Sequence, residues 1–130
     1  MQILVDTDVL IDYSKARSLE LELLLEKSVS GEVELFICPI NVAEFLNDKK
    51  LRLSERGLAV ALNFLKLFKI VELGRESGEI TAGILLGRNG IYLGDAFIAA
   101  ACVENDLRLF TRNKRHFEKI KGIKFYVVEV

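Results

Sequence analysis

The sequence predicts an α/β fold of three layers, in which helices cover both faces of a central parallel sheet of four to five strands. Short apolar runs alternate with longer segments of helical character along the whole chain. Glycine and proline are sparse, at 9 and 1 residues, so no stretch is typical of a linker or a repeat. A length of 130 residues suits one domain with its own hydrophobic core.

The first part of the chain predicts one strand and two helices. Gln2–Val5 is a short apolar run and is expected to be a buried strand. Val9–Lys15 is expected to be a helix, with Asp8 available as its N-cap. Ser18–Ser30 mixes leucines with glutamates in a pattern typical of a helix, and Gly31 bounds it.

The middle of the chain predicts two further strands and two helices. Glu34–Cys38 is expected to be a strand that ends at Pro39, since proline has no N–H for a sheet ladder. Ile40–Lys50 and Ser54–Leu67 are expected to be helices, and Phe68–Glu72 a short strand.

The last part of the chain continues the alternation. Arg75–Gly87 and the alanine-rich Leu93–Asn105 are expected to be helices. Leu107–Thr111 is expected to be a strand, Lys114–Ile120 a short helix and Lys124–Val130 a final strand. Because strands alternate with helices, the sheet is expected to be parallel.

The bulk composition is that of a soluble globular protein, with 51% hydrophobic and 28% charged residues. A net charge of −1 gives no sign of nucleic-acid affinity, so any site for a polyanion has to be a local patch. Cys38 and Cys102 lie in apolar stretches and are expected to be buried thiols, not disulfide or zinc ligands. No apolar run reaches the roughly 18 residues of a membrane helix. No signal sequence precedes the first strand, so a cytoplasmic protein is expected.

Acidic and amide residues follow several of the predicted strands. Asp6 and Asp8 end the first strand, where two carboxylates cost free energy unless a cation offsets them. Glu44 lies in the first turns after the second strand, Asp95 opens the alanine-rich helix, and Asn113 follows the fourth strand. The carboxyl ends of parallel strands share one edge, so these side chains are expected to converge. Their oxygen atoms suit Mg²⁺ or Mn²⁺, and no histidine and cysteine cluster suits zinc.

Each of these residues also has a purely structural interpretation. Asp6 suits the start of a turn. Asn41 and Glu44 have the spacing of a capping box. Asp95 and Asn113 suit helix N-caps. None of these interpretations explains why the residues share one edge of the sheet.

Basic residues lie next to the same edge and could contact phosphate groups. They are Arg112, Lys114, Arg115 and His116, with Lys119 and Lys121 beyond them. The alternative is a solvated helix face. His116 is the only histidine of the chain and could serve as a proton donor or pack against a helix.

Three segments together resemble the PIN-domain ribonucleases, and more narrowly the VapC-type toxins of bacterial and archaeal toxin–antitoxin pairs. The segments are VDTDVLIDY, NVAEFL and GDAFIAAACVENDLRLFTRNKRHF. The resemblance runs in order over nearly the whole chain, so residues 1–130 are expected to form a single PIN domain. It implies an α/β/α fold and metal-dependent cleavage of RNA with Mg²⁺ or Mn²⁺.

The resemblance also implies roles for individual residues. Asp6, Glu44 and Asp95 match the three acids of the family, with Asp6 and Asp95 binding the main ion and Glu44 binding the ion or orienting the water. Asn113 matches a fourth position that is Asp in some members and Asn in others, which leaves one negative charge fewer. These four residues are the candidate catalytic set.

Three neighbouring residues are expected to support this set. Asp8 stands where the family often has Asn or Ser and is expected to help from the outer shell. Thr7 and Thr111 are expected to orient ligands or water through their hydroxyl groups. Arg112, Lys114 and Arg115 are expected to contact RNA.

The segment Leu58–Phe68 is apolar around much of its circumference, which indicates either a central core helix or an interface. The resemblance favours an interface, because these toxins resemble dimers capped by a small antitoxin. The antitoxin inserts an apolar helix and a basic residue into the acidic pocket. A homodimer, a VapB-like antitoxin and an RNA substrate are therefore expected, with no membrane partner.

Two other enzyme or switch classes also combine an early strand with acids. A receiver-type phosphorylation switch needs an Asp after its third strand and a Lys-Pro after its fifth, but Val71–Gly74 has no Asp and Pro39 is the only proline. A haloacid-dehalogenase-type phosphatase usually continues Asp-x-Asp with Gly-Thr, and here Val9 and Leu10 follow. A PIN-fold binding module that has lost catalysis is the third alternative.

Overall fold

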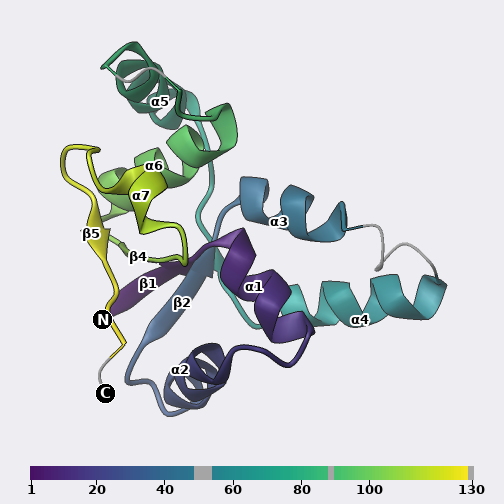
Figure 1. The fold of residues 1–130 in the computed structure, drawn as a ribbon. Helices are drawn as coiled ribbons and strands as arrows, with labels where there is room; N and C mark the ends of the chain where they lie inside the picture. Colours follow the sequence, from purple (N-terminus) through teal and green to yellow (C-terminus); the bar gives the residue numbers. More distant parts are fainter. Residues whose placement is uncertain (49–53, 88–89, 129–130) are drawn as a thin grey trace.

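A parallel sheet of five strands lies at the centre of the described structure, which comprises residues 1–48, 54–87 and 90–128 (Figure 1). The computed structural model orders the strands β3-β2-β1-β4-β5. The strands are β1 Gln2–Val5, β2 Glu34–Ile37, β3 Lys69–Ile70, β4 Arg108–Phe110 and β5 Lys124–Phe125. The helices are α1 Thr7–Ser14, α2 Leu19–Val29, α3 Pro39–Leu46, α4 Glu55–Leu65, α5 Arg75–Gly87, α6 Leu93–Asn105 and α7 Lys114–Phe117. The predicted three-layer α/β fold is confirmed.

Strand β1 is the centre of the sheet and has apolar cores on both sides. It pairs in parallel with β2 and with β4, so that Leu4 lies opposite Phe36 on one side and opposite Leu109 on the other. Ile3, Leu4 and Val5 are 0% exposed. A parallel strand in this position is buried on both faces, which explains its uninterrupted apolar sequence.

The two faces of the sheet have separate hydrophobic cores. Ile3 and Val5 pack with residues of α1, α2 and α4, whereas Leu4 packs with residues of α6 and α7 and with one partly buried residue of α5. The alternation follows from the two-residue period of a strand. Helix α3 contributes Phe45 to the first core and Ile40 to the edge of the second.

The chain changes direction across the sheet at β1. It first moves outward through β2 to β3 and then crosses to the other side of β1 to form β4 and β5. The carboxyl ends of β1 and β4 therefore meet at a switch point, where α/β proteins bind ligands. Receiver domains order their strands 2-1-3-4-5, so the observed order excludes the receiver alternative.

The ends of several elements differ from the sequence prediction. Helix α3 begins at Pro39, one residue before the predicted Ile40–Lys50, because proline suits the first helical position. Strands β3 and β5 are shorter than predicted, with two residues each, and both lie at the edges of the sheet. Residues 49–50 of the predicted third helix and 129–130 of the predicted last strand lie outside the described residues.

The cysteines and the helix lengths agree with the sequence analysis. Cys38 and Cys102 are free thiols that are 0% and 1% exposed. Among the described residues, no helix has both the length and the apolar character needed to cross a bilayer.

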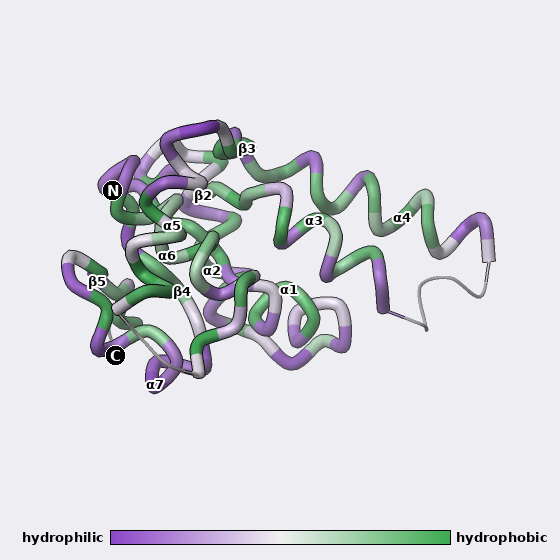
Figure 2. Tube along the Cα trace, turned by 90° about the horizontal axis from the view of Figure 1, so that it is seen from above, coloured by the Kyte–Doolittle hydropathy of each residue, from purple (hydrophilic) through white to green (hydrophobic). Residues whose placement is uncertain are grey.

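Helix α4 projects beside α3 away from the sheet, with polar and apolar residues alternating along it (Figure 2). Ala61 and Leu65 face the core, whereas Leu58, Val60 and Leu62 are 41%, 62% and 42% exposed. The interpretation of this segment as a central core helix is therefore wrong.

An aromatic cluster fixes α4 to the rest of the domain. The Phe64 ring stacks on Tyr13 of α1 with centroids 5.2 Å apart, lies 5.6 Å from the Phe45 ring and meets Phe68 edge-on at 5.4 Å. Such ring pairs add stability beyond the apolar area that they bury.

Phe64→Ala is expected to lower the free energy of unfolding by about 3 kcal/mol, because it removes three ring contacts and leaves a cavity. Urea denaturation followed by circular dichroism measures this. Leu62→Ala on the same helix is the control and is expected to cost less than about 1 kcal/mol, since Leu62 is 42% exposed. Equal losses in the two variants would contradict the anchoring role of the cluster.

Candidate active site

Asp6 is held at the carboxyl end of β1 by bonds to two neighbouring elements. Its backbone N–H donates to Phe110 O at 2.9 Å and so continues the pairing of β1 with β4. Its side-chain Oδ1 accepts from the Thr7 N–H, and its Oδ2 accepts from the Thr111 hydroxyl, both at 2.8 Å. Asp6 is the N-cap of α1, which corrects the assignment of that role to Asp8. The carboxylate is only 6% exposed.

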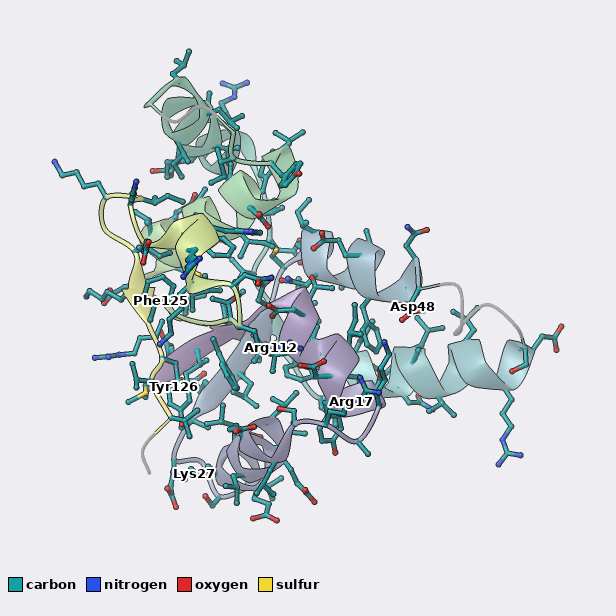
Figure 3. The ribbon with its side chains drawn as sticks, in the orientation of Figure 1. Arg17, Lys27, Asp48, Arg112, Phe125 and Tyr126 are labelled. Carbon is teal, nitrogen blue, oxygen red and sulfur yellow. The ribbon has the colours of Figure 1, made fainter. Side chains whose placement is uncertain are left out.

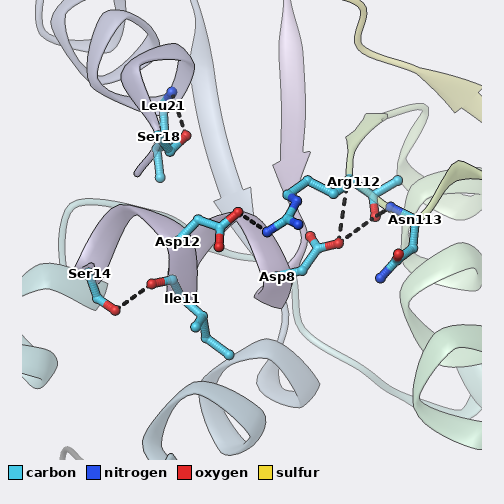
Figure 4. Close-up of polar contacts among 9 residues, drawn as sticks. Asp8, Ile11, Asp12, Ser14, Ser18, Leu21, Arg112 and Asn113 are labelled. Atoms are coloured by element: carbon cyan, nitrogen blue, oxygen red, sulfur yellow. Dashed lines mark hydrogen bonds and ion pairs between the residues drawn. The ribbon is translucent and has the colours of Figure 1, made fainter. Parts of the chain in front are cut away.

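Asp8 lies two residues further on, in the first turn of α1, and faces the segment after β4 (Figure 4). Its Oδ2 accepts from the Arg112 N–H at 3.1 Å and lies 3.4 Å from the Thr111 hydroxyl oxygen. Its Oδ1 is buried, and no hydrogen-bond partner for it is found among the described residues. One turn along the helix, Asp12 forms an ion pair with the Arg112 guanidinium, and the Asp12 side chain is 16% exposed (Figure 4).

Glu44 lies on α3 and reaches across to α1. Its Oε1 accepts from the Thr7 hydroxyl at 2.7 Å. Its Oε2 lies on the side of α6, 3.8 Å from the position that a Cβ atom on Gly94 would take. The capping-box interpretation of Asn41 and Glu44 is wrong, because Cys38 is the N-cap of α3 and Asn41 is its third residue.

Asp95 lies in the first turn of α6, next to Gly94. The N-cap of this helix is Tyr92, so the N-cap interpretation of Asp95 is wrong. Its Oδ2 lies 3.3 Å from Nδ1 of His116, which belongs to α7. Sequence reasoning placed His116 near the edge but did not pair it with Asp95.

Asn113 completes the set that the sequence predicted. It occupies the N-cap position of α7, but its side chain makes no capping hydrogen bond. Its backbone N–H donates to the Thr111 hydroxyl oxygen at 3.0 Å. Thr111 therefore connects Asn113, Asp6 and Asp8.

The basic residues after β4 differ in whether their side chains contact other residues. Arg112 lies beside α1 in the middle of the molecule, whereas Arg17 lies at the far end of that helix (Figure 3). The Arg112 guanidinium pairs with Asp12, and Lys114 Nζ lies 5.9 Å from the centre of the Phe125 ring. Arg115 is exposed.

Burial and mutual repulsion make the site unfavourable for negative charge. Burial, followed by the neighbouring charge of Asp8, raises the pKa of Asp6 from its ordinary value of 3.8 to about 7. The bonds from Thr111 and Thr7 act in the opposite direction, and the charge of Asp95 adds a smaller increase. Burial also raises the pKa of Asp8, against the effect of the Arg112 N–H.

The donor atoms are of the type that a hard divalent ion prefers, but they are not arranged around a common position for the ion. The set is made of oxygen atoms, and the buried Oδ1 of Asp8 lacks a partner. Within the described ranges, no group of three or more His, Cys, Asp or Glu side chains is already arranged to hold a metal ion. Each carboxylate instead has its own protein partner: Thr111 for Asp6, Thr7 for Glu44 and His116 for Asp95. Binding one ion between them requires some of these partners to be exchanged.

Asn41 is the site residue that sequence reasoning missed. Its side chain is 0% exposed and hydrogen-bonds both Cys38 and Thr7. The sequence offers one signal, an asparagine three residues before Glu44, but the same spacing also fits the capping box described above.

The raised pKa of Asp6 predicts that the metal-free fold loses stability as the pH rises. Folded Asp6 keeps its proton up to about pH 7, whereas the unfolded chain releases it near 3.8. The contribution is therefore fully present below pH 3.8 and is lost as the pH rises through about 7, by up to about 4 kcal/mol. Urea denaturation in chelator at pH 5 and pH 8 measures this for the parent and for Asp6→Asn.

The Asp6→Asn variant is expected to lack this decline, because its amide does not ionise. Asp106→Asn serves as a control whose pH profile follows the parent, since Asp106 is 81% exposed and remote in the fold from Asp6. Parallel pH profiles for the parent and Asp6→Asn would contradict the assignment.

Comparison with known proteins agrees with the family and the fold. A sequence model of the PIN domain matches residues 3–123. The chain is 36% identical over 132 residues to a protein named Ribonuclease VapC1 from Methanocaldococcus jannaschii, covering 96% of this chain and 87% of that protein.

Solved structures share the fold over nearly the full length. A DNA-bound VapBC from Salmonella typhimurium has a TM-score of 0.80 at 24% identity and covers 97% of both chains. VapBC2 from Rickettsia felis, bound to a promoter DNA fragment, has a TM-score of 0.79 at 19% identity and covers 99% of this chain and 100% of that one. The domain match and the 36% identical relative show that the chain belongs to the PIN-domain family, among its VapC-type members.

Proposed function

We propose that this protein is a metal-dependent endoribonuclease, a VapC-like toxin that hydrolyses RNA phosphodiester bonds and is inhibited by a cognate antitoxin. The observation that carries the proposal is the position of Asp6, a buried carboxylate beside Asp8 at the switch point of the sheet. Thr7 connects it to Glu44, and the charge of Asp95 contributes to its raised pKa. The relative named Ribonuclease VapC1 supports the same activity.

The residues that would hold the ion are Asp6 and Asp95, with Glu44 as the third acid. Their carboxylate oxygens suit Mg²⁺ or Mn²⁺. A divalent ion bound there would lower the pKa of a coordinated water and offset negative charge on the phosphate.

The protein residues position the reacting groups. The Thr7 N–H and the Thr111 hydroxyl fix both oxygens of Asp6. Glu44 orients the attacking water and accepts its proton as general base. The water oxygen bonds to phosphorus in line with the leaving 3′ oxygen, and the bond from phosphorus to that oxygen breaks. The released oxygen takes a proton from solvent, which leaves a 5′-phosphate and a 3′-hydroxyl. Asn113 completes the polar surroundings from the end of β4.

The RNA backbone is proposed to contact the basic residues after β4. Arg115 is exposed, and the Arg112 side chain is 62% exposed although it pairs with Asp12. Together with Lys114, these residues offer positive charge next to the carboxylates of Asp6 and Asp95, which would otherwise repel phosphate groups.

A homodimer and an antitoxin partner are proposed from the exposed apolar residues of α4. Leu58 and Leu62, one turn apart on α4, are 41% and 42% exposed, and Val60 on another side of the helix is 62% exposed, so α4 offers apolar surface to a partner. The solved structures of similar fold include complexes described as VapBC and, from Klebsiella pneumoniae, a toxin–antitoxin complex. Those descriptions support an antitoxin partner for this chain.

Asp6→Asn is expected to keep the fold and to reduce RNA cleavage by at least about 100-fold, because an amide offers a weaker ligand and no charge. The assay is cleavage of a labelled RNA with Mn²⁺, with and without chelator. Chelator is expected to abolish cutting by the parent.

Asp106→Asn is the matched control and is expected to cut at the parent rate, since its side chain is 81% exposed and pairs only with Lys124 in the described structure. Asparagine also tolerates the left-handed backbone found at this position, where φ is 52°. Cleavage by Asp6→Asn within a few-fold of the parent would exclude the assigned role of Asp6. Absence of cutting by the parent, with RNA still bound, would favour the alternative of a PIN-fold binding module.

Light scattering coupled to size exclusion is expected to give a dimer at micromolar concentration. Val60→Glu is expected to shift the protein toward monomer, because it places a charge at the most exposed apolar position of α4, which is 62% exposed. Glu55→Lys at the start of the same helix is the control and is expected to leave the mass unchanged. A monomeric parent would overturn the proposed dimer.

A further inference from the structure

A chain of hydrogen bonds links the backbone after β2 to the carboxylate of Glu44. The Cys38 N–H donates to Asn41 Oδ1 at 2.9 Å, and Asn41 Nδ2 donates to Thr7 Oγ1 at 3.1 Å. The Thr7 hydroxyl then donates to Glu44 Oε1 at 2.7 Å. Asn41 and Thr7 are 0% and 8% exposed, so water does not compete freely for these groups.

The direction of every donor in this chain follows from the first bond. A backbone N–H can only donate, so the Asn41 atom facing Cys38 is the carbonyl oxygen, and the amide nitrogen faces Thr7. The Thr7 oxygen accepts from that nitrogen, and its single proton is therefore available for Glu44. Oε1 of Glu44 is consequently fixed as an acceptor.

We propose that Asn41 is a positioning residue for the nuclease reaction, which orients Glu44 by fixing the hydroxyl group of Thr7. The inference rests on the proposed function for its kinetic consequence, but the hydrogen-bonded arrangement can be tested without RNA. Glu44 is exposed, and a glutamate side chain in that setting has several rotamers of similar energy. The bond from Thr7 selects one of them.

The second oxygen of Glu44 shows what this orientation achieves. With Oε1 bound to Thr7, Oε2 faces Gly94, next to Asp95 in the first turn of α6. The Glu44 carboxylate thus has one oxygen bonded to Thr7, next to Asp6, and the other facing Gly94, next to Asp95. Helix capping alone does not account for this arrangement, because the cap uses only Oδ1 of Asn41 and leaves Nδ2 for Thr7.

The test uses two variants that interrupt the chain at different points. Asn41→Leu has a similar volume but loses both bonds, including the helix cap. Thr7→Val keeps the cap and the shape and loses only the hydroxyl. Each is expected to lower kcat for RNA cleavage by about 10- to 100-fold with little change in KM, as is typical when a partner that orients a catalytic group is removed. Thr7→Ser is expected to recover most of the rate that Thr7→Val loses.

The double variant separates positioning from a general structural role. If Asn41 acts through Thr7, Asn41→Leu has little further effect on kcat once Thr7 is Val, so the two losses are not additive. Thr81→Val is the control, because Thr81 is also buried, at 2% exposed, and its hydroxyl bonds Ser77 O at 2.7 Å away from the site. It is expected to keep the parent kcat. Multiplying losses in the double variant, or a parent-like kcat in Thr7→Val, would overturn the inference.

An NMR measurement on metal-free protein without RNA provides the second readout. The carboxyl carbon signal of Glu44 is expected to shift in Asn41→Leu and in Thr7→Val but not in Thr81→Val. If the parent does not cut RNA, the proposed function fails while this measurement still decides whether Asn41 orients Glu44. An unchanged Glu44 signal in both variants would overturn the inference even if the parent is an active nuclease.

Discussion

The burial of one carboxylate at the end of the central strand is the constraint on which the rest of the site depends. Asp6 is 6% exposed, and its pKa of about 7 shows how strongly the fold opposes its charge. The protein does not offset that charge with a lysine or an arginine in contact with Asp6 among the described residues. It uses a backbone N–H and one hydroxyl group instead. These neutral donors stabilise the carboxylate only partly, which leaves it suited to a cation from solution.

Two threonines organise the polar groups around this carboxylate. Thr111 connects Asp6 with Asp8 and with the backbone of Asn113, and Thr7 connects Glu44 with Asn41. Both hydroxyls are buried and directly follow or border the ends of β1 and β4. The strands therefore set the position of the hydroxyls, and the hydroxyls set the direction of the acids. Helices α3 and α6 need only bring Glu44 and Asp95 within reach.

Much of the fold could be predicted because it depends on local pattern. The bounds of Arg75–Gly87 and Leu93–Asn105 were predicted as observed, since apolar period and small residues define a helix without knowledge of its neighbours. The caps were harder: Asp6 and Asp8 are both good N-caps, and the choice depends on where β1 stops pairing with β4. The link from Asn41 to Thr7 joins residues 34 positions apart, which no local pattern reports.

The side chains of β1 point alternately to the two faces of the sheet, and this alternation affects both the cores and the acidic residues that follow the strand. Ile3 and Val5 belong to one core and Leu4 to the other, so inserting or deleting a single residue in this strand would exchange the two cores. The same one-residue change would move the Asp6 side chain to the opposite face of the sheet, away from Thr111. An insertion or deletion in this strand would therefore disturb both the hydrophobic cores and the acidic site. The length of β1 determines where Asp6 lies relative to the end of β4.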